Sequence, residues 1–120
     1  MTIARNLSET TPFKIDSTTY TMATMPNRVL LAVTEMGQAA QTETLVRFGV
    51  SGWSGLTLKG SVAVPCVRDV IDLNGLRGMG IVDETFDVIP VTHMAALAGE
   101  AFRVNSLTEE EVGNSSAPLE

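Results

Sequence analysis

An alternating stretch near the start of the chain, residues 12–23, most constrains the fold. Its sequence, PFKIDSTTYTMA, places apolar side chains at every second position on either side of the polar Asp16-Ser17 step. Period-two spacing is typical of strands that bury one face, and a polar dipeptide between two such runs favours a tight turn. The segment therefore predicts a β-hairpin with strands over roughly 12–16 and 19–23.

Apolar residues in the rest of the chain recur mainly at helical spacing. The most regular stripe begins after Thr92, a favourable N-cap residue, and continues to Phe102. In the first predicted helix, which follows Pro26, several β-branched residues leave a strand over 28–34 as an alternative. The predicted helices span 27–36, 40–49, 65–73, 82–89 and 92–102.

Glycine-spaced segments separate these helices. LTLKGSVAV, residues 56–64, predicts a second, smaller hairpin or an extended loop, and NGLRGMG, residues 74–80, predicts a glycine-rich connection. The fold class that follows is α+β: a small single domain with an N-terminal β-hairpin followed by several short helices. We expect a flexible arm over 1–11, a globular domain over 12–106, and a mostly disordered acidic and polar tail over 107–120. Within the tail, the Thr108–Glu111 capping pattern allows one helical turn at most.

The distribution of charged and of apolar residues argues against two classes of partner. The chain has a net charge of -6, and its eight basic residues are scattered. Phosphate binding requires clustered Lys and Arg, so we expect no nucleic-acid partner. No apolar run approaches the ~20 residues of a membrane helix, so we expect no membrane association. The single cysteine, Cys66, cannot form an intrachain disulfide, which fits a reducing cytoplasm.

Candidate catalytic and metal-binding residues are few. The order of glycines in GLRGMG reverses the dinucleotide-binding fingerprint, and His93, the only histidine, has no second ligand at metal-site spacing. Asp83, Glu84 and Asp87 do not match a calcium loop and indicate a solvated helix face. Cys66 follows Pro65 at a predicted helix start, which leaves a thiol enzyme using Cys66 and His93 as a minor alternative. The sequence thus predicts no enzyme, no metal and no cofactor.

The only tryptophan, Trp53, lies between Gly52 and Ser54. It is interpreted either as an anchor of the hydrophobic core or as part of a partly exposed apolar patch with Phe48 and Leu56. Tryptophan is enriched at protein interfaces because it buries a large area with little loss of rotamer freedom. We therefore name Phe48, Trp53 and Leu56 as predicted partner-binding residues, with the core interpretation kept open.

The order of several short motifs resembles a known group of proteins. TYTMATMPNRVLLAV is followed by a short apolar helix that leads into GVSGW, then by AVP before a predicted helix, and NSLTEEEVGNSS closes the chain. This order resembles the tail assembly chaperones of long-tailed bacteriophages and prophages, over about residues 12–116.

The resemblance implies a non-enzymatic protein in the cytoplasm of the bacterial host. Such a chaperone binds the tape measure protein, and sometimes tail tube subunits, until the tail polymerises. The family is more helical than the hairpin predicted over 12–23. That departure keeps a structural component of the virion, such as a tail tube-associated or head–tail completion protein, as the alternative. The sequence does not specify an oligomeric state.

Overall fold

The N-terminal hairpin forms as its alternation predicts. In the computed structural model, which describes residues 4–59 and 61–106, β1 (Thr10–Ile15) and β2 (Thr18–Ala23) pair antiparallel. Asp16 turns the chain with a φ of 54°, a conformation that aspartate tolerates better than most residues. The strand β3 (Val50–Ser54) adds to the other edge of β2, with a bulge between Thr21 and Met22. The predicted hairpin and the α+β class are confirmed.

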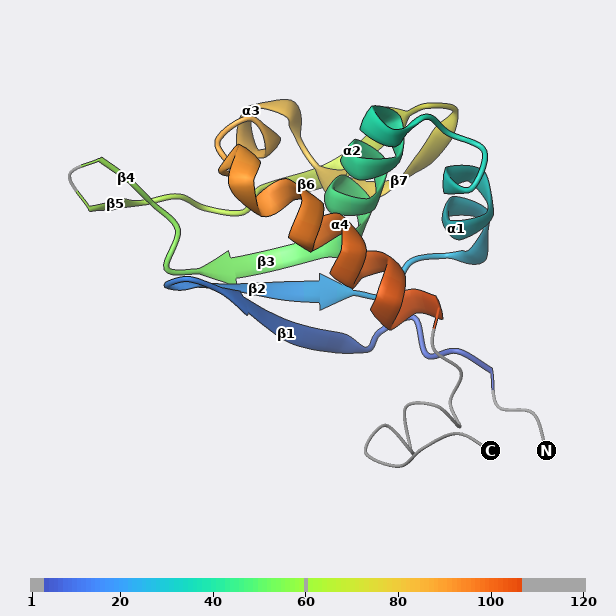
Figure 1. Cartoon of the computed structure of the whole chain (residues 1–120), viewed down its shortest axis with the longest axis horizontal. Coiled ribbons are helices and arrows are strands. Elements are labelled where there is room, and N and C mark those ends of the chain that lie inside the picture. The colour runs from blue at the N-terminus through green and yellow to red at the C-terminus, as the bar shows by residue number, and fades with distance from the viewer. Residues whose placement is uncertain (1–3, 60, 107–120) are drawn as a thin grey trace.

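Helices cover one face of this three-stranded sheet (Figure 1). The helices are α1 (Asn27–Val33), α2 (Gln38–Gly49), α3 (Asp83–Phe86) and α4 (Val91–Ser106). Residues 27–33 form a helix, so the alternative of a strand over 28–34 is wrong. Two helix lengths also differ from the predictions: α3 is only four residues long, and α4 continues to Ser106.

The core lies between β2, α2 and α4. Leu97, Ala98 and Ala101 of α4 are buried there and belong to the same cluster as Tyr20 and Met22 of β2. The two helices α2 and α4 approach closely, since a Cβ built on Gly49 would lie 2.8 Å from the Cβ of Ala101. The glycine at the end of α2 is therefore needed for this helix packing.

Residues 68–81 form a hairpin, which corrects two predictions. A helix over 65–73 and a loop over 74–80 were expected, but β6 (Arg68–Leu73) pairs antiparallel with β7 (Leu76–Ile81). Asn74 and Gly75 join the strands with φ of 53° and 82°. Positive φ at both central residues is the type I′ geometry that Asn-Gly favours between paired strands. The turn chemistry thus decides the structure over the helical spacing of Val67, Val70 and Ile71.

A second short hairpin projects from the body of the molecule (Figure 1). Its strands are β4 (Thr57–Leu58) and β5 (Val62–Ala63), and we call the described residues 57–59 and 61–63 the arm. Of the two predictions for residues 56–64, the hairpin is confirmed. The segment before it, which contains Gly52, forms the strand β3. Its sequence alone does not favour a strand, but pairing with β2 holds its backbone in an extended conformation.

The ends of the described chain are held to the body. Arg5, in the N-terminal segment for which flexibility was predicted, donates hydrogen bonds to Asn27 Oδ1 (2.6 Å) and to Asn105 Oδ1 (2.8 Å). Residues 10 and 11 of that segment belong to β1. The predicted tail and its capping pattern lie outside the described residues. None of the described helices combines the length and apolar character that crossing a membrane requires.

Candidate functional site

The three predicted partner-binding residues lie in different environments. Phe48, in the last turn of α2, is 5% exposed, and Leu56, directly before β4, is 8% exposed. Trp53, in β3, is half-buried and packs against the core cluster. An exposed patch made of all three side chains is therefore not formed, because Phe48 and Leu56 are buried. Partner binding by these residues stays a prediction, and only Trp53 presents area to a partner in this fold.

Trp53 joins the core to the arm. Its ring packs edge-on against Tyr20, with ring centroids 6.0 Å apart and an interplanar angle of 78°. Its indole Nε1 donates a hydrogen bond of 2.8 Å to the carbonyl oxygen of Val64, directly after β5. The Val64 amide in turn donates to the Leu56 carbonyl oxygen at 2.9 Å. Trp53 and Leu56 thus fix the base of the arm, and Trp53 also packs against the core, whereas its binding of a partner stays a prediction.

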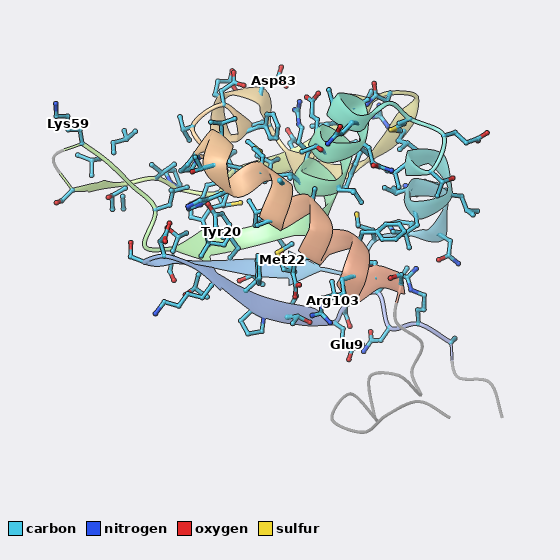
Figure 2. All side chains as sticks on the ribbon, viewed as in Figure 1. Glu9, Tyr20, Met22, Lys59, Asp83 and Arg103 are labelled. Atoms are coloured by element: carbon cyan, nitrogen blue, oxygen red, sulfur yellow. The ribbon has the colours of Figure 1, made fainter. Side chains whose placement is uncertain are left out.

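Beneath Trp53, the only tyrosine and the only histidine form a buried pair. Tyr20 Oη lies 2.8 Å from His93 Nδ1, and His93 Nε2 lies 3.4 Å from a carboxylate oxygen of Asp16 in the β1–β2 turn. Figure 2 shows Tyr20 between α4 and the sheet. Burial raises the pKa of Tyr20 to about 12. The chain of contacts links the hairpin turn to the first turn of α4, so its role is to orient these elements.

The raised pKa of Tyr20 predicts a loss of stability in alkali. The folded state holds this proton more tightly than the unfolded chain, whose tyrosine pKa is the ordinary 10.0. The stabilisation is complete below pH 10 and is lost as the pH rises toward about 12. Tyrosinate absorbance reports this one residue, because the chain has no other tyrosine. We expect its midpoint near 12 in the folded protein and expect Tyr20→Phe to flatten the decline in unfolding temperature over that window; a midpoint near 10 would contradict the burial.

The arm exposes the apolar side chains that the sequence did not single out. Leu58 and Val62 are directly paired across β4 and β5 and are 52% and 58% exposed. Cross-strand partners lie on the same face of a hairpin, so the two side chains form one small apolar surface. Lys59 follows at the tip and points away from the body (Figure 2). The alternation in LTLKGSVAV is the signal that could have identified them.

Phe48 packs against the β6–β7 hairpin. Its ring lies 3.6 Å from the position that a Cβ on Gly78 would take, so the glycines of β7 allow the hairpin to lie close to α2. The opposite face of this hairpin carries Val70 and Met79, a cross-strand pair of which each member is about half exposed. We call Val70, Met79 and the flanking Asp72–Arg77 ion pair the outer face.

The other candidate residues lie in different surroundings in the fold. Cys66 is half-buried, and burial raises the pKa of its thiol, with the positive charge of Arg68 opposing that rise. A higher pKa lowers the fraction of nucleophilic thiolate. His93 turns its ring nitrogens to Tyr20 and Asp16, and Asp83 pairs with Arg47. Among the described residues, no group of three or more His, Cys, Asp or Glu side chains is placed to hold a metal ion.

No family model matches the chain, and comparisons with curated proteins and with solved structures also find no match. A proposal for its function therefore depends on its own residues and geometry.

Proposed function

We propose that this chain is a non-enzymatic tail assembly chaperone of a long-tailed phage or prophage. It binds the tape measure protein during tail morphogenesis, in the cytoplasm of the bacterial host. The order of the GVSGW, AVP and NSLTEEEVGNSS motifs supports this proposal, and the outer face of the β6–β7 hairpin is the observation that carries it. A holdase needs an apolar surface that stays exposed on a soluble, charged body.

The outer face meets this requirement. Val70 and Met79 present apolar area side by side, and the unbranched thioether of Met79 can repack around different partner side chains. Phe48 lies under the hairpin and holds it against α2, so the face is preformed. The Asp72–Arg77 pair (2.7 Å) borders the apolar pair with one charge of each sign. An apolar centre with a charged rim is the usual anatomy of a protein interface.

Co-expression with the long, helical tape measure protein of the same gene cluster tests the proposal. We expect the tape measure protein to be soluble and to co-purify only when this chain is present. Met79→Glu places a charge in the centre of the outer face and is expected to weaken binding about tenfold or more, equivalent to ~1.4 kcal/mol. Leu31→Glu, on exposed α1, introduces the same charge elsewhere and is the matched control. Equal loss of solubility with both variants would contradict the assigned surface.

A structural component of the virion is the second candidate. The β1–β2 hairpin favours it, because the chaperone family is more helical than this chain. The two functions differ in what finished particles contain. A chaperone is absent from purified tails, whereas a structural protein is present at fixed stoichiometry. Unchanged tape measure solubility, together with this chain in purified tails or heads, would replace the chaperone proposal with the structural one.

A further inference from the structure

The arm differs in charge from the rest of the chain. Lys59 is the only charged residue between Arg47 and Arg68, in a protein whose net charge is -6. It stands next to the exposed Leu58–Val62 pair, so the arm has an apolar surface with a single positive charge at its tip. Any acidic surface with exposed apolar side chains complements it.

Such a surface exists where α3 leads into α4. Val91, in the first turn of α4, is 82% exposed, and Val88, three residues earlier, is also exposed. Asp87 precedes Val88, and Glu84 lies one turn before it; both are exposed. We call Val88, Val91, Asp87 and Glu84 the valine patch. Its valines can pack against the apolar pair of the arm, and its negative charges are opposite in sign to Lys59, so the patch complements the arm.

We propose that the arm of one copy docks on the valine patch of a second copy. Leu58 and Val62 contact Val88 and Val91, and the Lys59 ammonium lies opposite Asp87 and Glu84. The arm points away from the body of its own chain (Figures 1 and 2), so Leu58, Lys59 and Val62 are accessible to another molecule. The contact joins two different surfaces and is therefore heterologous, which repeats in a ring or an open chain of copies.

The size of the contact predicts its strength. Two apolar side chains and one ammonium on each arm bury far less than the roughly 800 Å² per partner of a stable interface. We therefore expect a dissociation constant on the order of 100 µM. Exposed charges are screened by salt, so raising the ionic strength weakens the association. This proposal goes beyond the chaperone function and does not depend on it.

Sedimentation equilibrium of the purified chain tests the docking, over concentrations from about tenfold below to tenfold above that constant. Lys59→Glu and Asp87→Lys each place like charges at the contact and are expected to weaken self-association about tenfold or more. An equimolar mixture of the two variants restores opposite charges at one contact and is expected to associate more strongly than either alone. Lys14→Glu, on the exposed side of β1, makes the same charge change outside the contact and leaves association unchanged.

Three results would overturn the proposal. The first is a chain that remains monomeric throughout the concentration range. The second is a Lys59→Glu variant that associates as strongly as the unaltered chain. The third is a mixture of the two variants that associates no more strongly than either variant alone. A monomeric chain whose Lys59→Glu variant loses tape measure binding in co-expression would assign the arm to that partner instead. Since sedimentation uses this chain alone and the chaperone test uses the outer face, failure of one proposal is distinguishable from failure of the other.

Discussion

Replacing Asn105 with alanine is expected to lower the free energy of unfolding by about 3 kcal/mol. The buried amide of Asn105 connects the end of α4 to the segment after β2. Its Oδ1 accepts from the Met25 amide at 2.6 Å, and its Nδ2 donates to the carbonyl oxygens of Ala23 (3.1 Å) and Ala101 (2.8 Å). Alanine would leave the buried Met25 N–H without its acceptor, which costs more than the loss of an average hydrogen bond.

Urea unfolding at neutral pH measures this change, with Asn27→Ala as the matched control. Asn27 also accepts a hydrogen bond from Arg5, at 2.6 Å, but it is exposed, so water replaces the lost partner. We expect the control to change stability by less than about 1 kcal/mol. Similar losses of stability for both variants would contradict this, because they would show that Asn105 stabilises the fold through its hydrogen bond with Arg5 and not through the buried amide network.

Replacing Arg47 with methionine is expected to lower the free energy of unfolding by about 2 to 3 kcal/mol. Arg47 is buried on α2, and its Nε donates to the carbonyl oxygen of Ile81 at 2.9 Å. Its other nitrogens contact Glu43 (2.9 Å) and Asp83 (2.6 Å). Methionine preserves much of the apolar stem but removes every donor, so the Ile81 carbonyl loses its partner and α3 loses its tie to α2.

Arg103→Met is the control for the loss of a cation. The guanidinium of Arg103 binds Glu100 one turn earlier on the exposed side of α4, and such surface pairs contribute at most about 1 kcal/mol. Thermal and urea unfolding of both variants should separate them clearly. If Arg47→Met were no more destabilising than Arg103→Met, the buried guanidinium would be replaceable by apolar packing, as happens for some buried ion pairs.

Local pattern predicted those parts of the fold that local interactions determine. The alternation around Asp16-Ser17 gives β1 and β2, and the stripe ending at Phe102 gives α4. The β6–β7 hairpin was mispredicted because its valine and isoleucine spacing also fits a helix, and the Asn74-Gly75 turn signal was read only as a helix end. A two-residue turn with positive φ at both positions was the stronger signal.

Long-range contacts could not be predicted in the same way. β3 takes its conformation from pairing with β2, thirty or so residues earlier. Asn105 and Arg47 bond to groups far away in sequence, and no spacing rule joins them. At the candidate site, the sequence indicated that Trp53 either anchors the hydrophobic core or binds a partner. Only the fold shows that its indole also holds the base of the arm, through the hydrogen bond to the Val64 carbonyl oxygen. The exposed pairs on the arm and on the outer face depend on strand register, which the sequence left open.

The late position of α4 in the chain has a consequence for synthesis. Folding on the ribosome proceeds from the N-terminus as residues emerge. The strands and α2 leave the ribosome first, yet the face of α2 that meets α4 stays uncovered until Leu97, Ala98 and Ala101 have been made. Nascent chains that stop before this helix expose that apolar face to solvent. Premature termination would therefore yield aggregation-prone fragments, and α4, the last of the described helices, completes the core when it packs on α2.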